Sequence, residues 1–446
     1  MSDSSTPPSV SDAVYEQLRN AITEARSKGD NKTVVALCKK MGLTFMEAGD
    51  APQALTEFNE AIKLVSKDED KESFAQLLGL RGLALKSIGN YSLAMQAFRK
   101  SNALAREIKH PALSCDSLIY LAMLQSEMGK IEDAISVLND SLALAVEFKD
   151  KVRRMRIYGL LGDNFTKHIN PAKAIEFFQM AELTAQDLGN RAAECSFITK
   201  MGNVFLLEGK TENAIEKYER AFKFASALED RNAEINILGG LFRAHALAGE
   251  LNLAQVYGEQ AINLASQINH FEAEIANIQA MVVFLIEQEQ VDKVFPLLER
   301  GMQIVHEQTN LGWQMEILNL QGQAYSLQEK YNEAIKSWNA ALTLASNLQD
   351  EPFMALMFGR MAVVLAETDD IERSVYCAEN AVQLAQKLED AKLAAEQQIL
   401  LAFNFNDLKQ REKAIGFCQA AIKSYEIVGD RMMIANAQAL LNDLNS

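Results

Sequence analysis

Histidine and cysteine are the residue types in this chain that could bind a metal ion or act as a nucleophile. The five histidines are scattered, and no two of them have the spacing of metal ligands on one helix. The five cysteines include no Cys-x-x-Cys pair, and Cys115 and Cys195 lie 80 residues apart. A phosphate-binding glycine loop and a nucleophile elbow are also absent from the sequence. We therefore expect no enzyme activity, no metal and no cofactor.

Composition and charge narrow the function further. The 446 residues are 48% hydrophobic and include only 7 prolines, a balance typical of a packed helical protein. The net charge of -16 repels a phosphate backbone and an anionic membrane surface. No apolar run is long enough to span a bilayer. Five cysteines without a disulfide pattern suit a reducing compartment. We expect a cytoplasmic protein with neither a nucleic-acid partner nor membrane insertion.

The elements that would position any site follow a 40-residue repeat. Small residues recur at this interval, and one column reads Ala54, Ala94, Ala134, Ala174, Ala214, Ala254, Val294, Ala334, Ser374 and Ala414. A second column of mostly small residues begins at Gly42, and a third begins at Ala61. Three columns with one period indicate a repeat architecture.

Each repeat is predicted to contain two helices. Large apolar residues such as Phe58, Phe98 and Tyr218 stand three, four or seven positions from the small ones, which is the spacing of a helix face. Glycines such as Gly129 break each repeat, and a column of Asp, Asn and His that begins at Asp70 closes it. Because one pair of helices cannot bury its own apolar face, the repeats must stack into a solenoid.

The same periodicity predicts the boundaries. Ten repeats fill residues 31–430, residues 11–29 form an N-terminal capping helix, and residues 431–446 form a C-terminal one. Residues 1–10, which lack the features of a secretory signal, are expected to be a disordered tail.

Repeats six and seven depart from the pattern. Phe242 and Val282 replace small residues, and Pro296 falls inside a predicted helix, which it is expected to kink. We therefore expect a joint near 242–301.

Two repeats in particular resemble the tetratricopeptide repeat. The residues that carry this pattern are Gly202, Phe205, Ala214, Tyr218 and Ala221 in one repeat, and Gly322, Tyr325, Ala334, Trp338 and Ala341 in the other. The long period is similar to that of the LGN and Pins adaptors. The resemblance implies an all-α fold, an α-solenoid in which ten helix hairpins with capping helices at both ends form a right-handed superhelix. It also implies that the first helices line a concave groove.

Carried over onto this sequence, the groove positions of repeats four to six are polar. They are Arg156, Asp163, Thr166, Lys167, Ser196, Thr199, Asn203, Asn236 and Arg243. An extended peptide could place a carboxylate against Arg156 or Arg243, since charge-assisted hydrogen bonds are about twice as strong as neutral ones. Its backbone amides could pair with Asn203 and Asn236. Alternatively, these are solvated surface side chains.

On either side the groove positions are apolar. They are Leu43, Met46, Leu83, Ile119 and Met123 before the polar stretch, and Val283, Ile286, Leu356, Val363 and Phe403 after it. If partly exposed, they would take apolar anchors of a partner, and otherwise neighbouring helices bury them. A basic cluster, either a docking surface or a solvated face, consists of Lys149, Lys151, Arg153, Arg154 and Arg156.

These features predict a non-enzymatic scaffold or adaptor that binds a peptide or a helical segment of a protein partner in the groove. Two alternatives stay open. One is a regulator that controls an enzyme or a transcription factor and resembles the peptide-sensing bacterial tetratricopeptide regulators. The other is a structural component that self-associates through its terminal repeats.

Overall fold

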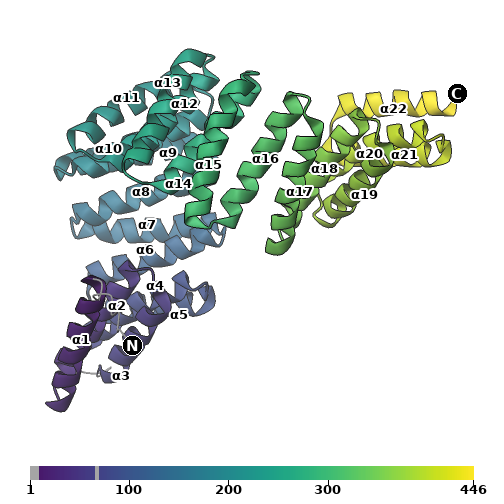
Figure 1. The fold of residues 1–446 in the computed structure, drawn as a ribbon. Helices are drawn as coiled ribbons and strands as arrows, with labels where there is room; N and C mark the ends of the chain where they lie inside the picture. The colour runs from purple at the N-terminus through teal and green to yellow at the C-terminus, as the bar shows by residue number, and fades with distance from the viewer. Residues whose placement is uncertain (1–9, 66–69) are drawn as a thin grey trace, which may run out of the picture. The chain divides into compact units, whose positions relative to one another are not determined.

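The structure, a computed structural model, describes residues 10–65 and 70–446, with only the backbone of residues 10–13. Over these ranges 22 α-helices and one 3-10 helix follow one another, and the described residues include no β-strand (Figure 1). The predicted all-α repeat fold is confirmed. The predicted disordered tail lies outside the described residues, apart from Val10.

The chain divides into two compact units, residues 1–248 and residues 249–446. The helices of the first unit are α1 (Val10–Ser27), α2 (Asn31–Glu47), α3 (Ala51–Leu64), α4 (Lys71–Ser87), α5 (Tyr91–Glu107), α6 (Pro111–Glu127), α7 (Ile131–Glu147), α8 (Lys151–Lys167), α9 (Pro171–Asp187), α10 (Arg191–Leu207), α11 (Thr211–Ala227) and α12 (Arg231–Leu247). Those of the second are α13 (Leu251–Gln267), α14 (Phe271–Glu287), η1 (Val291–Lys293), α15 (Val294–Gln308), α16 (Leu311–Leu327), α17 (Tyr331–Leu348), α18 (Glu351–Glu367), α19 (Ile371–Lys387), α20 (Ala391–Asp407), α21 (Arg411–Val428) and α22 (Arg431–Asn445).

The column of residues that closes the repeats caps every second helix from α4 to α22. Each of its ten side chains accepts a hydrogen bond from the backbone N–H three residues further on. Asp230 Oδ1, for example, lies 3.0 Å from the Ala233 nitrogen. His110 and His270 accept in the same way through Nδ1. These bonds satisfy donors that the first turn of a helix leaves without a partner, so the predicted helix starts are confirmed.

Turns within the repeats contain a residue with left-handed backbone conformation. Gly129 takes this conformation with φ 74°, as the sequence predicts for the glycine turns. The same position in other repeats is occupied by residues with side chains, among them Ile169 with φ 52° and Glu329 with φ 57°. The repeat therefore imposes the turn even where the sequence does not favour it.

Small residues of the first helix pack directly against aromatic rings of the second. A Cβ atom added at Gly82 would lie 2.4 Å from Cε1 of Phe98, which is fully buried. Gly322 approaches Trp338 in the same way, with 2.3 Å to Nε1. In both pairs the ring lies 16 positions after the glycine. The small columns thus mark close helix approach, as predicted.

Successive hairpins stack within each unit. In the first unit α4 contacts α6, α6 contacts α8 and α10 contacts α12, so its first helices follow one another in the stack. In the second unit α14 contacts α16 and α18 contacts α20. Cys115 and Cys195 are buried, and their Sγ atoms lie 3.5 Å and 3.4 Å from backbone oxygens of the following second helix, which fits their predicted packing role.

The structure corrects the role of Pro296. Residues Val291–Lys293 form the 3-10 helix η1, and α15 begins at Val294, so Pro296 is the third residue of α15 rather than an interior one. Because N–H groups in the first turn have no acceptor within the helix, a missing one costs little there. The proline therefore lies in the first turn of α15, directly after η1, and breaks no hydrogen bond in the interior of α15. A kink at Pro296 therefore no longer supports the joint near 242–301, which stays a prediction.

Candidate functional site

The predicted polar groove residues of the first unit lie on α8, α10 and α12, and none of them is buried. Those that are exposed are Arg156, Lys167, Ser196, Asn203, Asn236 and Arg243, and those that are half-buried are Asp163, Thr166 and Thr199. All nine side chains are accessible to a ligand.

A pocket of about 580 Å³ brings several of these residues together, and we call it the Asn203 pocket. It lies between α10 and α12, beside the end of α11. Its lining includes five predicted groove residues, which are Ser196, Thr199, Asn203, Asn236 and Arg243. A pocket of this size is large enough for a small ligand or for part of a peptide.

The Tyr218 hydroxyl holds the side chain of Asn203 in place. Its ring packs against Gly202 and Gly240, where added Cβ atoms would lie 2.8 Å and 2.6 Å from Cε1. The hydroxyl donates a 2.6 Å hydrogen bond to Asn203 Oδ1. Burial raises the pKa of Tyr218 to about 12, although the neighbouring Arg243 opposes the shift, so the hydroxyl stays a donor at neutral pH. Asn203 therefore turns its oxygen inward, and its amide N–H groups remain donors for a ligand.

Asp163 is already engaged with a cation. Lys200 Nζ lies 2.8 Å and 2.7 Å from its two carboxylate oxygens. The Lys200 ammonium also lies 5.6 Å from the centre of the Phe178 ring. The predicted acidic member of the groove is thus neutralised, and the sequence pattern did not reveal this ion pair.

Arg156 and Lys167 lie outside the Asn203 pocket. The Arg156 guanidinium stands 5.4 Å from the centre of the Tyr120 ring, and its Nη2 lies 3.7 Å from Met123 Sδ. Lys167 Nζ donates to Ser126 Oγ at 3.0 Å. Neither cation has a carboxylate within ion-pair distance among the described residues. The predicted polar set therefore separates into two places along the first unit.

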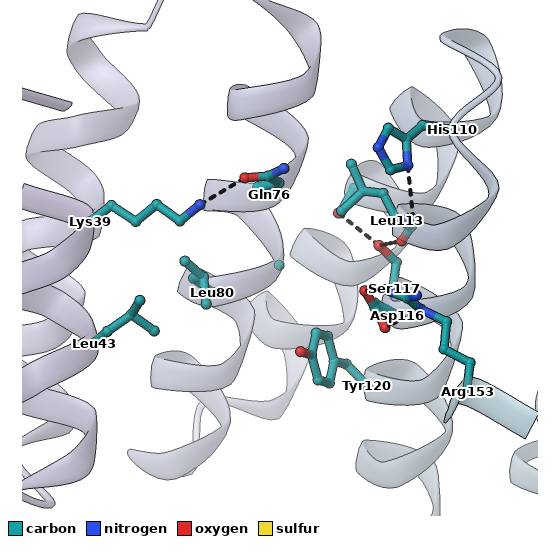
Figure 2. A pocket seen from close by; sticks show the side chains of 12 residues that line it. Lys39, Leu43, Gln76, Leu80, His110, Leu113, Asp116, Ser117, Tyr120 and Arg153 are labelled. Atoms are coloured by element: carbon teal, nitrogen blue, oxygen red, sulfur yellow. Dashed lines mark hydrogen bonds and ion pairs between the residues drawn. The ribbon is translucent and has the colours of Figure 1, made fainter. Parts of the chain in front are cut away.

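A second pocket, of about 250 Å³, was not predicted, and we call it the Gly79 pocket (Figure 2). Its lining residues are Lys39, Leu43, Gln76, Gly79, Leu80, Ser101, His110, Leu113, Asp116, Ser117, Tyr120 and Arg153. Only Leu43 among them was a predicted groove residue. The repeat column of Gly79 gave no signal for this pocket, because glycine recurs in it at Gly159, Gly239 and Gly359.

Polar side chains around the Gly79 pocket pair across neighbouring first helices. Lys39 Nζ donates to Gln76 Oε1 at 2.7 Å (Figure 2). Arg153 binds both carboxylate oxygens of Asp116, at 2.9 Å and 2.6 Å, and also Asp150 at 2.6 Å. These hydrogen bonds raise the pKa of Arg153. Asp116 is therefore neutralised, whereas Lys39 has a neutral partner.

The predicted basic cluster does not form one surface patch. Arg153 is half-buried and bound to aspartates, while Arg156 is exposed and its guanidinium lies over the Tyr120 ring. Lys151 Nζ pairs with Asp187 Oδ2 at 3.1 Å. Its members therefore have different surroundings and separate roles.

The predicted apolar groove residues are accessible, with one exception. Those that are exposed are Leu43, Val283, Leu356, Val363 and Phe403, and those that are half-buried are Met46, Leu83, Met123 and Ile286. Ile119 is fully buried, so its assignment to the groove is wrong. The repeat pattern placed Ile119 together with Met123, one helical turn later on α6, but only Met123 is partly exposed.

Reactive groups are few in the described part of the chain. Within it, no group of three or more His, Cys, Asp or Glu side chains is arranged to hold a metal ion. All five cysteines are free thiols and buried, and burial raises the pKa of Cys38 and of Cys377 to about 11. None of the described helices is both long and apolar enough to span a membrane.

Two segments of the chain match a protein-family model. Residues 75–108 and 316–348 match the model described as Tetratricopeptide repeat. The chain contains tetratricopeptide repeats. The matched segments correspond to the hairpins α4–α5 and α16–α17, one in each unit. No curated protein matches the sequence of this tetratricopeptide chain.

Solved structures share the tetratricopeptide fold at low sequence identity. The apo form of RapI is 10% identical over 80% of this chain and 99% of its own, with a TM-score of 0.57. The apo quorum sensor NprR from B. thuringiensis is 15% identical over 83% of this chain and 97% of its own, with a TM-score of 0.52. A signal transduction ATPase with a tetratricopeptide repeat sensor from Pyrococcus horikoshii is 14% identical over 96% of this chain and 69% of its own, with a TM-score of 0.55. These similarities concern the fold.

Proposed function

We propose that the chain is a non-enzymatic scaffold that binds a peptide or helical segment of another protein along the first helices of its first unit. The observation that carries the proposal is the Asn203 pocket, whose lining brings Arg243 together with amide and hydroxyl side chains and also includes Lys200 and Asp230. Arg243 has no carboxylate within ion-pair distance among the described residues. A cation in this position is suited to a carboxylate supplied by a ligand.

Each of these side chains would bind a different part of the ligand. Arg243 and Arg156 would each donate hydrogen bonds to an acidic group of the ligand, and the amides of Asn203, which Tyr218 holds in place, and of Asn236 would pair with its backbone. Lys167 adds a third cation on the same side of the first unit. Phe403 and Val363 on the second unit offer a separate apolar surface for a partner. The LGN and Pins type of adaptor remains the similarity suggested by the long repeat.

The absence of enzyme activity is part of the proposal. Covalent catalysis by cysteine requires a thiolate. The raised pKa values of the buried Cys38 and Cys377 keep both groups protonated at neutral pH. A cytoplasmic location agrees with this free-thiol state.

A regulatory role is the second candidate. NprR, which shares the fold, is a quorum sensor, and the signal transduction ATPase of similar fold carries a tetratricopeptide repeat sensor. Peptide binding by this chain would then control an enzyme or a transcription factor. Self-association is the third candidate, and light scattering over a concentration series separates it from a monomeric adaptor.

Selection from a displayed random-peptide library with the full chain tests the proposal. Affinities of the enriched peptides are then measured for the wild type and for the double variant Arg156→Glu, Arg243→Glu. We expect the double variant to weaken binding at least about tenfold, because each reversal replaces an attraction with a repulsion.

The control is a double variant that makes the same change in charge on the second unit. Lys336→Glu with Lys392→Glu alters two exposed lysines of the second unit and should leave the affinities unchanged. Equal affinities for wild type and the groove variant would refute the assignment. Turnover of a small-molecule substrate by the purified chain would refute the non-enzymatic role.

A further inference from the structure

His110 caps α6 with an imidazole, where most repeats use a carboxylate or an amide. Its Nδ1 atom lies 3.2 Å from the Leu113 nitrogen and accepts the hydrogen bond from this backbone N–H (Figure 2). At the same position of the next two repeats, Asp150 and Asn190 accept through side-chain oxygens. An imidazole nitrogen accepts a hydrogen bond only while it carries no proton. The cap of α6 therefore requires that His110 is neutral.

The other ring nitrogen of His110 faces a carboxylate. Nε2 lies 3.5 Å from Oε1 of Glu72, which belongs to α4, the first helix of the preceding hairpin. Because Nδ1 is an acceptor in the capped state, the ring proton is on Nε2. A second proton would go to Nδ1 and place a cation beside Glu72. One imidazole thus links the cap of α6 to an ion pair between α4 and α6.

Two neighbours of His110 act on this second proton in opposite directions. The Glu72 carboxylate attracts the imidazolium. The first turn of α6 opposes it, because an N–H at Nδ1 would point at the Leu113 N–H and because the N-terminus of a helix repels a cation. Capping and binding of the proton therefore exclude each other. It follows that a fall in pH shifts the population of α6 towards the uncapped form.

The other charged groups on the helices packed against α6 are accounted for. Those joined in ion pairs are Lys71 with Glu107, and Arg153 with both Asp116 and Asp150. Those exposed at the neighbouring ends of α5 and α7 are Arg106, Lys109, Glu147 and Lys149. Lys39 of α2 donates to the neutral Gln76. Among the described residues, Glu72 is the carboxylate within ion-pair distance of His110.

We propose that His110 is a pH-sensitive switch at the junction of α4 and α6. Between about pH 7.5 and about pH 5.5 it takes up a proton, releases the Leu113 N–H and pairs with Glu72 as a cation, so that the first turn of α6 opens. The switch alters the Gly79 pocket, whose lining includes His110, Leu113 and Asp116. It concerns the free chain and does not depend on the proposed function.

Hydrogen exchange on the intact chain measures the opening. Exchange of residues 111–118 is followed by mass spectrometry at about pH 7.5 and about pH 5.5, and is corrected for the intrinsic effect of pH on amide exchange. The internal control is residues 191–198, the same segment of α10, which Asn190 caps. Relative to this control, exchange of residues 111–118 should become at least about threefold faster at the lower pH, because a lost cap weakens the first turn.

Two variants separate the switch from general destabilisation by acid. His110→Asn keeps a type of cap that other repeats use and removes the titrating group, so residues 111–118 should exchange alike at both pH values. Glu72→Gln keeps the cap and removes the attraction for the cation, so opening should require a lower pH than in the wild type. Circular dichroism checks that both variants are folded, and His110→Asp replaces His110→Asn if the latter is unfolded.

Nuclear magnetic resonance of the chain with isotope-labelled histidines observes the proton directly. Nδ1 of His110 should be unprotonated at about pH 7.5 and protonated at about pH 5.5, and the signal that His110→Asn removes identifies the residue. A protonated Nδ1 at the higher pH would overturn the inference. Equal pH dependence of residues 111–118 and 191–198 in the wild type would also overturn it, and so would an unchanged pH dependence of residues 111–118 in His110→Asn.

Discussion

A glycine inside a helix of this chain has one of two opposite effects, and each can be recognised only from what surrounds the glycine. At Gly82 the missing Cβ atom lets the Phe98 ring approach the backbone of α4. At Gly79, one helical turn earlier, it leaves open space. At Gly416 it does neither. The same residue type therefore serves packing, a pocket and no evident contact within one fold.

Gly82→Ala should destabilise the chain. The added Cβ atom lies 2.4 Å from Cε1 of Phe98, so the ring or the helix must move, and such overpacking costs about 1 to 3 kcal/mol. Gly416→Ala should instead stabilise it by up to about 1 kcal/mol, because only helix propensity changes. Urea unfolding followed by circular dichroism measures both. Equal midpoints for the two variants would contradict the packing role of this column.

Helices here begin and end through local chemistry that recurs every 20 residues. A left-handed residue ends one helix, and an Asp, Asn or His side chain caps α2 and every second helix from α4 to α22. Where the left-handed position lacks glycine, the conformation is imposed by the helices on both sides. Ile169 is the extreme case, since it is β-branched and 89% exposed. Such a residue gains little from packing and carries the full conformational cost.

Ile169→Gly should therefore stabilise the chain by about 1 kcal/mol, the usual penalty of the left-handed conformation for a residue with a side chain. The reverse change at the same position of the preceding repeat, Gly129→Ala, should destabilise it by a similar amount. Nothing lies within 4 Å of a Cβ atom added at Gly129, so its effect is purely conformational. Thermal unfolding of both variants gives the measurement. A loss of stability in Ile169→Gly would show that the exposed side chain makes a contact the structure does not contain.

At the scale of the whole molecule, contacts join each hairpin mainly to its neighbours. Stability in such a stack is close to a sum of repeat and interface contributions, so weak places open locally. The predicted joint near 242–301 is one such place. The prediction is still supported by Phe242 and Val282, which stand where other repeats have small residues. It is also supported by α15, which is 15 residues long and has no hydrogen bond from a capping side chain.

Hydrogen exchange tests this joint on the intact chain. Amides of residues 280–305 should exchange faster than those of residues 320–345, the same segment of the next repeat, because opening is cheapest where fewest contacts are lost. Mass spectrometry of peptic fragments resolves the two segments. Uniform protection would remove the joint and leave the irregular residues as tolerated substitutions.

Much of this fold is predictable because its contacts have constant sequence separations. The Gly82 and Phe98 pair, 16 residues apart, belongs to one hairpin, and the hairpin repeats with its caps and turns. The start of α15 at Val294 was missed because Pro296 is compatible both with a kink inside a longer helix and with a helix that begins only two residues before it. The burial of Ile119 was missed because the repeat pattern does not distinguish it from Met123, one helical turn later on α6, which is partly exposed.

The candidate site is less predictable because its side chains meet across repeats. Lys200 pairs with Asp163, 37 residues before it, and Arg153 pairs with Asp116 at the same separation. That separation is one repeat less one helical turn, so it depends on how neighbouring first helices are placed against each other. The sequence predicted Arg156 and Arg243 as groove cations. Only the structure shows that Lys200 and Arg153 are paired with aspartates, whereas Arg156 and Arg243 have no such partner among the described residues.

From the sequence alone follow the all-α repeat, the helix starts and the aromatic-on-glycine packing, because each depends on residues close together in one hairpin. Tertiary structure alone decided which charges stay available and that a pocket opens at Gly79 between neighbouring first helices. The physical reason is distance along the chain. Packing within a hairpin is determined by local periodicity, whereas a binding surface is assembled from side chains whose neighbours belong to the next repeat.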